Sequence, residues 1–413
     1  MYQMSGNCLV GQSGGPTAAI NASLSGVIKQ ALNSSLIKEV YGTINGIEGV
    51  INKNIIDLAK TFISDNDLEL LKHTPAAYLG SCRFKLPTVD LNDNKIYTQI
   101  FDTFKEYGIR YFFYIGGNDS MDTVMKLNHY AQKISYPIHI IGIPKTIDND
   151  LQVTDHTPGY GSAAKFIATS VLEIAKDSEV YNVDSVVIIE IMGRNAGWLT
   201  AASALAKSNY SDSPDLIYLP EVPFSIDKFI KDIKEVQKRK KNVVVCVSEG
   251  LKDASGKYIC ESVSSGLIDV FGHKALGGTG KVLEETVRNK RKCKVRSVEL
   301  NVLQRCAAHI ASLTDINEAY EIGKQAVICA EAGNTGKMMI FKRQPDKEYG
   351  VSIEAVDINL IANKEKLVPR EWINEEGNYV TDELIRYMKP LIMGEPKLTM
   401  KDGLPVYLTR PNI

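Results

Sequence analysis

The chain has 413 residues, of which 44% are hydrophobic, so it is long enough for one large or two ordinary domains with a sizeable core. Its 48 basic and 49 acidic residues leave a net charge of −1. This balance argues against a nucleic-acid or membrane-surface protein, because such proteins usually carry a basic excess. Any site for an anion is therefore expected to be local.

The cysteines and the hydropathy pattern predict a cytoplasmic protein. The seven cysteines are scattered, and no two have CxxC spacing. They are expected to be free thiols in a reducing compartment, with Cys8 and Cys246 as core residues because both lie in apolar runs. No signal peptide opens the chain and no apolar run approaches membrane-spanning length, so no membrane partner is expected.

Apolar runs that alternate with helix-period segments predict an α/β fold. Buried strands are predicted at 8–10, 111–115, 138–141, 186–189 and 243–247, and each ends in a glycine-rich or polar cluster. Strands alternating with helices indicate βαβ units and mostly parallel sheets flanked by helices. In such sheets ligands bind beyond the carboxyl ends of the strands, so the clusters are expected to meet in one cleft.

Two lobes of similar size, with the active site between them, fit the length of the chain. We predict that one lobe comprises residues 1–160 and about 306–375, and the other about 161–305 and about 376–413. The second lobe is expected to carry an insertion near 251–294, which is rich in glycine and lysine. The loop-rich tail after about Asp357 is expected to pack over both lobes.

The segment Gly142-Ile-Pro-Lys-Thr-Ile-Asp-Asn-Asp150 is the most informative part of the chain. In an extended segment Asp148 and Asp150 share a face, so one carboxylate can accept a proton while the other faces a metal. Lys145 adds a positive charge close by. Phosphoryl transfer needs such a base, cations for the phosphate oxygens and fixed placement. The alternative is a polar loop that caps a helix.

Two glycine-rich turns follow predicted strands. Ser13-Gly-Gly-Pro-Thr17 leads into a helix, where backbone amides can approach a phosphate, although a tight turn needs glycine anyway. Neither a Walker A loop nor the dinucleotide pattern GxGxxG is present. In Gly116-Gly-Asn-Asp-Ser120, Asp119 is either a helix cap or a negative charge in a phosphate cleft.

Three further groups of residues are candidates for binding. Arg194, in Met192-Gly-Arg194, is either a bidentate clamp on a phosphate or part of a surface ion pair. Glu249 either accepts hydrogen bonds from sugar hydroxyls or begins a helix. Arg296 and Arg305 lie in or near a basic region that otherwise predicts a solvated face.

Taken together and in this order, GGPT, GGND, PKTIDND, MGR and a later LQR resemble the phosphofructokinase family. The resemblance runs from about residue 7 to about residue 310 and implies the two-lobed fold of that family, with the first lobe binding the phosphoryl donor and the second the sugar phosphate. It further implies that Asp148 is the general base for the 1-hydroxyl of fructose 6-phosphate, assisted by Lys145, Asp119 and Arg83.

The resemblance also assigns the binding residues. Those implied for the sugar phosphate are Thr146, Ile147, Met192, Gly193, Arg194, Glu249, Arg296, Val302 and Arg305. Arg296 is usually supplied by a neighbouring subunit, which implies a homodimer or homotetramer. Gly14, Gly15 and Gly117 are implied for the donor phosphate, and Asn118, Asp119 and Asp150 for Mg²⁺.

Two positions predict the phosphoryl donor. ATP-using bacterial members resemble GGDGS and PGTIDND, whereas this chain has Asp119 and Lys145 at the differing positions, as in the pyrophosphate-dependent branch. Asp119 would meet the α-phosphate of ATP, and Lys145 could stabilise charge in the transition state. The predicted reaction is therefore reversible transfer from pyrophosphate, in glycolysis.

Some positions depart from the family pattern. Asn118 replaces an aspartate, Ser185 stands where ATP-using enzymes usually have an arginine, and Ser25 and Lys29 replace arginines of an effector site. Two alternatives remain: an ATP-dependent phosphofructokinase, and a non-catalytic subunit that binds sugar phosphates. The second would be expected to lack the base or the arginine of MGR, and both are present.

Overall fold

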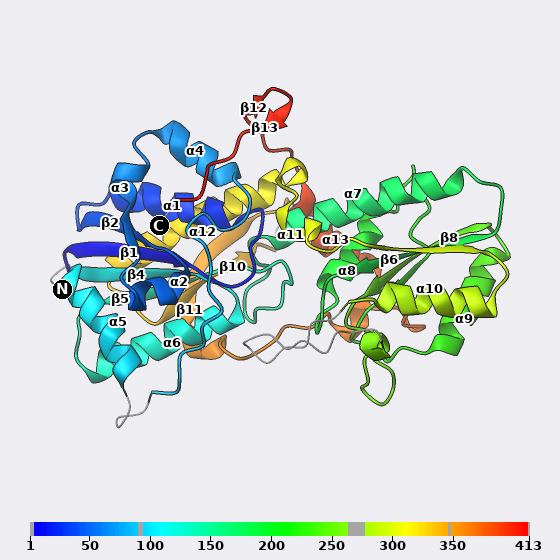
Figure 1. Ribbon diagram of the computed structural model, residues 1–413, viewed down its shortest axis with the longest axis horizontal. Helices are drawn as coiled ribbons and strands as arrows, with labels where there is room; N and C mark the ends of the chain where they lie inside the picture. Colours follow the sequence, from blue (N-terminus) through cyan, green and yellow to red (C-terminus); the bar gives the residue numbers. More distant parts are fainter. Residues whose placement is uncertain (1–3, 90–93, 263–276, 346–347, 412–413) are drawn as a thin grey trace.

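Apolar strands form two main sheets, one in each lobe, and amphipathic helices pack against them (Figure 1). The computed structural model describes residues 4–89, 94–262, 277–345 and 348–411. Within these residues, all the helices are too short or too polar to cross a membrane. All seven cysteines are described and free, as predicted, and Cys8 and Cys246 are fully buried.

The larger sheet has the order β11-β10-β5-β4-β1-β2-β3. Its central strands pair in parallel, and the antiparallel strands β3 and β11 lie at its two edges. The strands are β1 (Gly6–Gln12), β2 (Ile37–Thr43), β3 (Ile55–Asp57), β4 (Ile109–Gly116), β5 (His139–Pro144), β10 (Lys337–Arg343) and β11 (Val351–Asp357).

Helices cover both faces of this sheet, which explains the unbroken apolar runs of its central strands. Tyr111 and Phe113 of β4 pack in the same cluster as residues of α1 and α12, whereas Phe112 and Tyr114 pack with α5 and α6. The helices of this lobe are α1 (Ile20–Leu32), α2 (Gly46–Ile51), α3 (Leu58–Thr61), α4 (Asp65–His73), α5 (Lys95–Glu106), α6 (Asn118–Lys133) and α12 (Leu313–Glu331).

The smaller sheet is parallel and has the order β7-β8-β6-β9. Its strands are β6 (Ser185–Ile191), β7 (Leu216–Tyr218), β8 (Asn242–Ser248) and β9 (Lys294–Glu299). The helices nearby are α7 (Tyr160–Glu179), α8 (Trp198–Ala202), α9 (Ile226–Gln237), α10 (Thr279–Lys290), α11 (Leu303–Cys306) and α13 (Asp382–Met388).

Short elements complete the described chain. They are the 3₁₀ turns η1 (Ser203–Ala206), η2 (Ile259–Ser262), η3 (Ala308–Ile310), η4 (Ile358–Leu360), η5 (Arg370–Trp372) and η6 (Lys389–Ile392), and a hairpin of β12 (Met400–Lys401) and β13 (Leu404–Pro405).

The segment 251–294 is expected from the sequence to be an insertion, but its second half contributes a helix that packs against the smaller sheet. Residues 279–290 form α10, which lies between β8 and β9 in the chain and buries Leu283 and Val287 beneath the smaller sheet. A helix that joins two parallel strands of one sheet belongs to the core of the lobe. Residues 263–276 of the segment lie outside the described residues.

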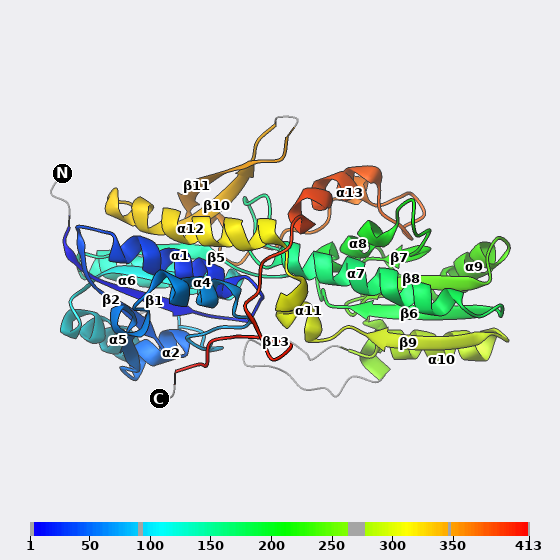
Figure 2. The ribbon, with the colours of Figure 1, turned by 90° about the horizontal axis from the view of Figure 1, so that it is seen from above.

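The chain passes between the lobes more than once (Figures 1 and 2). It enters the smaller lobe through α7, returns near α11, and goes back to pack α13 in the core cluster of the smaller lobe. The tail then returns to the larger lobe, where the amide of Leu408 donates to Thr74 Oγ1 at 3.1 Å. The tail thus contacts both lobes, while the exact division of the chain into lobes remains a prediction.

Candidate active site

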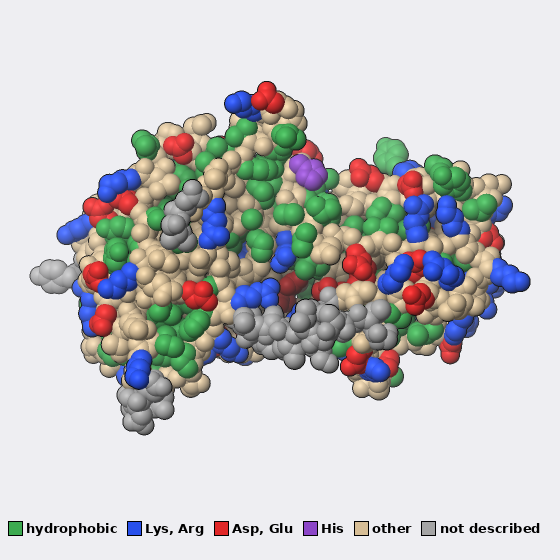
Figure 3. All heavy atoms as spheres, in the orientation of Figure 1, with side chains coloured by type: hydrophobic (Ala, Val, Ile, Leu, Met, Phe, Trp, Pro, Cys, Tyr) green, Lys and Arg blue, Asp and Glu red, His purple; other side chains and the backbone are tan. Residues whose placement is uncertain are grey.

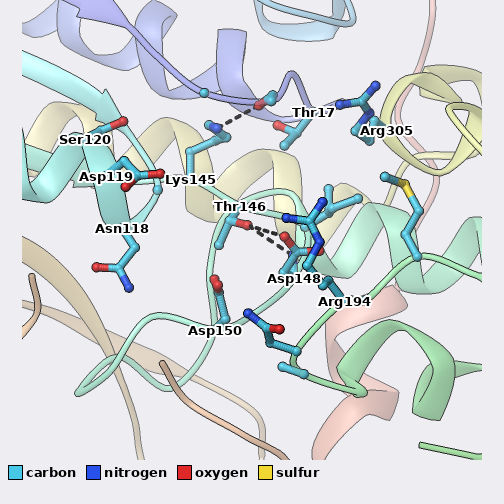
Figure 4. Close-up of a pocket in the computed structure, with 18 of the residues that line it drawn as sticks. Thr17, Asn118, Asp119, Ser120, Lys145, Thr146, Asp148, Asp150, Arg194 and Arg305 are labelled. Carbon is cyan, nitrogen blue, oxygen red and sulfur yellow. Dashed lines mark hydrogen bonds between the residues drawn. The ribbon is translucent and has the colours of Figure 1, made fainter. Parts of the chain in front are cut away.

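A cleft of about 630 Å³ lies between the lobes, at the carboxyl ends of β1, β4 and β5 on one side and of β6 and β8 on the other (Figure 4). Parallel strands place their following loops at one edge, so this is where the predicted clusters meet. The predicted residues that line the cleft are Gly14, Gly15, Arg83, Gly117, Asn118, Asp119, Lys145, Thr146, Ile147, Asp148, Asp150, Met192, Gly193, Arg194, Glu249 and Arg305. On the face of the molecule seen in Figure 3, acidic and basic side chains are interspersed.

Asp148 follows β5 in a loop that bonds to itself. Its carboxylate accepts a hydrogen bond from Thr146 Oγ1 at 3.4 Å, and its amide donates to the same hydroxyl at 3.2 Å. Desolvation raises the pKa of Asp148, while the charges of Lys145, Arg194 and Arg305 act in the opposite direction. The loop therefore presents a carboxylate whose proton affinity is increased, next to three cations.

Lys145 connects this loop to both glycine-rich turns. Its Nζ donates to the carbonyl of Gly15 at 2.7 Å, and its amide donates to the carbonyl of Gly116 at 2.9 Å. Gly14 has a φ of +78°, and a Cβ there would lie 3.2 Å from Lys145 Nζ. Burial lowers the pKa of Lys145 to about 8, against the opposing charges of Asp148 and Asp150.

Several acidic side chains are crowded in the cleft. Burial, together with the neighbouring charges of Asp148 and Glu365, raises the pKa of Asp150 to about 7. Burial also raises the pKa of Glu249 to about 7, although its Oε1 accepts a hydrogen bond from the amide of Gly193 at 3.2 Å. This excess of buried negative charge would stabilise a cation bound in the cleft.

Two guanidinium groups face the cleft with unused donors. The Nε atoms of Arg194 and Arg305 are buried and have no hydrogen-bond partner among the described residues. Arg305 lies beside the first glycine-rich turn, because a Cβ on Gly15 would be 3.3 Å from its Nη1. Unpaired buried donors are costly, so these two arginines indicate an anion site.

Asn118 and Asp119 begin α6 but face different surroundings. The Nδ2 of Asn118 donates to the carbonyl of Lys364 at 2.8 Å, and its Oδ1 accepts from the amide of Asn363 at 2.7 Å. Asp119 lies in the first turn of the helix, and Gly117 rather than Asp119 is the N-cap residue. In the described part of the chain no cluster of three or more His, Cys, Asp or Glu side chains could hold a metal ion.

Comparisons with known proteins identify the family of the chain. A model of the family described as Phosphofructokinase matches residues 7–330. The chain belongs to the phosphofructokinase family. It is 40% identical to the pyrophosphate–fructose 6-phosphate 1-phosphotransferase of Halomonas elongata, over 97% of this chain and 94% of that protein. It is also 40% identical to the protein of the same name from Xanthomonas campestris pv. campestris, over 99% and 97%.

A solved structure of this family agrees with the fold. The pyrophosphate-dependent phosphofructokinase of Nitrosospira multiformis superposes with a TM-score of 0.88 at 37% identity, covering 98% of this chain and 96% of that one. The prediction of a phosphofructokinase-like α/β fold with mostly parallel sheets flanked by helices is thus confirmed.

Two residues lie outside the cleft, although the resemblance to phosphofructokinases implied that they bind the sugar phosphate. Arg296, on β9, is 45% exposed and forms an ion pair with Asp177 at 3.0 Å. Val302 is 50% exposed at the N-cap of α11. Neither lines the cleft of its own chain, so a role for Arg296 requires a neighbouring subunit and remains a prediction.

The sequence did not single out three residues that line this phosphofructokinase cleft: Asn195, Asn363 and Glu365. Asn195 directly follows MGR, so its place in the sequence could have predicted that it lines the cleft. Its Nδ2 donates to Glu365 Oε1 at 2.8 Å across the cleft. Asn363 and Glu365 lie far from the other site residues in the chain, in a segment without a recognisable motif, and only the fold brings them in.

Proposed function

We propose that the chain catalyses reversible, magnesium-dependent phosphoryl transfer from pyrophosphate to the 1-hydroxyl of fructose 6-phosphate, giving fructose 1,6-bisphosphate and phosphate. The observation that supports this most directly is the position of Asp148. It is a carboxylate of raised pKa, it lies in the interlobe cleft, and the charges of Lys145, Arg194 and Arg305 act on it. Two named relatives with nearly full coverage support the same donor and acceptor.

In this reaction Asp148 accepts the proton of the 1-hydroxyl as that oxygen attacks a phosphorus of pyrophosphate. The new bond joins the sugar oxygen to phosphorus, and the bond to the bridging oxygen breaks, so that phosphate leaves. A general base works best when its pKa is close to the working pH, and desolvation moves that of Asp148 in this direction. Lys145 and Arg83 provide positive charge for the transferred group and the leaving phosphate.

Asp119 and Lys145 support pyrophosphate as the donor. Both line the same cleft as the two glycine-rich turns, so a nucleotide bound there would meet the carboxylate of Asp119. A charge of the same sign in a partly enclosed cleft disfavours the longer donor without weakening the shorter one. Lys145 holds the Gly15 turn by its Nζ and is therefore already positioned to meet a phosphate on that turn.

The acidic residues of the cleft suit a magnesium ion. Mg²⁺ commonly binds one or two carboxylates and completes its shell with substrate phosphates and water, so three close protein ligands are not required. Asp150 and Asp119 would hold it, and the raised pKa of Asp150 reflects negative charge that a cation would offset. The amide oxygen of Asn118 already accepts a bond from Asn363, so Asn118 suits this role less well. When bound, the ion neutralises charge on the transferring phosphate.

The sugar phosphate would lie against the smaller lobe. Arg194 and Arg305 have free buried donors for its phosphate, and Glu249 lies close enough to the cleft to accept hydrogen bonds from its hydroxyls. Thr146 and Ile147 from the catalytic loop, and Met192 and Gly193 beside Arg194, complete this side in the proposal. Arg296 of a neighbouring subunit would complete the site of a homodimer or homotetramer, in the cytoplasm, without nucleic-acid or membrane partners.

A comparison of donors at fixed fructose 6-phosphate and Mg²⁺ tests the proposal. Turnover with pyrophosphate and little or none with ATP is expected, and turnover with ATP alone would instead support the ATP-dependent enzyme. If purified protein binds the sugar phosphate but turns over with neither donor, the non-catalytic alternative is supported. The double variant Lys145→Gly with Asp119→Gly is expected to lose most of the pyrophosphate activity.

A further inference from the structure

Lys366 is a polar residue close to the active site for which the proposed mechanism has no role. The residue as a whole is half-buried, but its ammonium group points inward. Nζ donates to the carbonyls of Asp155 at 2.8 Å and Thr154 at 3.1 Å, and lies 3.5 Å from Asn149 Oδ1. All three acceptors belong to the segment that begins directly after the base Asp148, so Lys366 closes that segment into a loop.

The backbone of Lys366 contacts both lobes. Its amide donates to the carbonyl of Asp150 at 2.7 Å, and its carbonyl accepts from Trp198 Nε1 at 2.8 Å. Its Nζ lies 5.1 Å from the centre of the Trp198 ring, within range of a cation–π interaction. Trp198 begins α8 of the smaller lobe, so Lys366 couples the catalytic segment to the wall that bears the sugar site.

Lys366 ends a short segment, Asn363–Lys366, that we call the cleft strap. The amide of Asn363 donates to Asn118 Oδ1 at 2.7 Å, at the start of α6. The side chain of Glu365 accepts from Asn195 Nδ2 at 2.8 Å, and its carbonyl accepts from Gln152 Nε2 at 2.6 Å. The strap therefore contacts the donor turn, the catalytic segment and the loop after the arginine of MGR.

The catalytic segment needs this support because its backbone is strained. Asn149, between the two aspartates, is fully buried and has a φ of +54°, in the left-handed region. Such a conformation persists where the surroundings fix it. Two groups do so here: Lys366 Nζ beside Oδ1, and the hydroxyl of Tyr387, which accepts from Nδ2 at 3.0 Å.

We propose that Lys366 is a positioning residue, whose ammonium group fixes the segment Asn149–Asp155 and thereby the directions of the Asp148 and Asp150 carboxylates. The inference rests on the proposed function, since it assigns a role in the same reaction. A carboxylate that must take a proton from a bound hydroxyl is sensitive to small displacements, and a misplacement of about 1 Å can lower a rate about 10²-fold. Lys366 does not line the cleft, so it acts through these residues and not on the substrate.

The variant Lys366→Met tests this role, because methionine is an unbranched side chain of similar length that carries no charge. We expect kcat with pyrophosphate to fall about 10- to 100-fold. The KM for fructose 6-phosphate should change about threefold or less, because the sugar contacts remain. Lys366→Arg, which keeps a charged donor, should retain more of kcat than Lys366→Met. The matched control is Lys165→Met, because Lys165 Nζ similarly donates to a backbone carbonyl, that of Gly394 at 2.6 Å, but its hydrogen bonds go to residues outside the segment 149–155.

Structural measurements separate this inference from the proposed function. Hydrogen exchange of the segment 149–155 should increase in Lys366→Met and not in Lys165→Met, whether or not either protein turns over. Trp198 and Trp372 are the two tryptophans of the chain. In a Trp372→Phe background, Lys366→Met should therefore change the emission of Trp198 alone.

Two outcomes would overturn the inference. One is a Lys366→Met protein with kcat within about twofold of the parent and unchanged exchange at 149–155. The other is equal loss of kcat and of thermal stability in Lys366→Met and Lys165→Met, which would indicate a general structural role. If the parent protein shows no turnover with pyrophosphate, the proposed function fails, and the exchange and emission data still decide whether Lys366 holds the segment.

Discussion

Asp148 and Lys145 have opposite shifts of pKa, and a single cause explains both. Loss of solvent disfavours the charged form of each group, so it raises the pKa of the acid and lowers that of the ammonium group. Their mutual attraction opposes both shifts. The pKa of each group therefore lies closer to neutral pH than it would in water. This suits a base and a cation that act in one step.

Removal of the base is the most direct test at this scale. Asp148→Asn keeps the size of the side chain and cannot accept the proton of the hydroxyl. We expect kcat to fall by about 10²- to 10⁴-fold, the usual contribution of general-base catalysis, with a much smaller change in KM. Steady-state kinetics in both directions measure this. A kcat within about tenfold of the parent would show that another group acts as the base.

The pH dependence of kcat/KM for pyrophosphate follows from the same shifts. Lys145, with a pKa of about 8, loses its charge as the pH rises through that value, so donor binding should weaken above about pH 8. Asp150, with a pKa of about 7 in the absence of a bound cation, becomes protonated as the pH falls, and it titrates as a pair with Asp148. We therefore expect a bell-shaped profile with its maximum between the two limbs.

Lys145→Met isolates the alkaline limb of this profile. The variant lacks the Lys145 ammonium group, so its residual kcat/KM for pyrophosphate should be much lower. Its fall near pH 8 should be shallower than that of the parent, because of the two lysines only Lys366, whose pKa burial also lowers to about 8, still loses its charge there. The acid limb should remain, because Asp148 and Asp150 are unchanged. An alkaline limb as steep in Lys145→Met as in the parent would assign that ionisation to a different group.

At the scale of elements, the contact between α1 and α12 depends on two glycines. A Cβ on Gly26 would lie 2.0 Å from the carbonyl oxygen of Tyr320, and one on Gly323 would lie 2.2 Å from that of Ser23. Both clashes are with backbone, which cannot rotate away. The helices cover one face of the larger sheet, so a shift between them would also disturb the packing beneath the first glycine-rich turn.

Gly26→Ala tests whether this close approach is needed. In a solvent-exposed helix, replacing glycine by alanine would stabilise the protein by about 0.5–1 kcal/mol. Here we expect the opposite, a loss of about 1–3 kcal/mol of unfolding free energy, since the helices must move apart. Denaturant unfolding measures the change, with Gln30→Ala on the same helix as the control. A more stable Gly26→Ala protein would contradict the predicted clash.

The strands and helices that the sequence predicted differ in solvent exposure from those that it missed. The predicted runs overlap β1, β4, β5, β6 and β8, whose residues are almost all buried and therefore form almost unbroken apolar stretches in the sequence. The strand β9 was missed, because Lys-Val-Arg-Ser-Val-Glu is half solvated and its charges suggested an exposed face. The helix α10 was hidden in the same basic region.

The same distinction applies to the site. Residues directly after buried strands, such as Lys145, Asp148 and Arg194, were found because each motif follows a recognisable apolar run. Glu365 and Lys366 were missed, since nothing local distinguishes a polar loop that folds back over the cleft from one that remains in solvent. Their positions result from contacts with residues more than 150 positions away in the sequence, such as Asn195 and Trp198.

At the scale of the whole molecule, Arg296 tests the proposal that the site is shared between subunits. The side chain is on β9, outside the cleft of its own chain, and pairs with the exposed Asp177. A surface pair of this kind contributes little to stability, so Arg296→Leu should leave the fold intact. If a neighbouring subunit uses Arg296, this variant should raise the KM for fructose 6-phosphate and leave that for pyrophosphate nearly unchanged.

Mixed oligomers of Arg296→Leu and Asp148→Asn provide the decisive measurement. Each variant alone should be nearly inactive at low fructose 6-phosphate, because Arg296→Leu binds the sugar phosphate poorly and Asp148→Asn lacks the base. In a mixed dimer, the Arg296→Leu subunit keeps its own Asp148 and receives Arg296 from the other subunit, so one of the two sites is complete. Random exchange makes about half of the dimers mixed, and the mixture should recover about a quarter of the parent activity. Exchange in mild denaturant followed by assay tests this, and recovery no greater than the sum of the separate variants would mean that each subunit works alone.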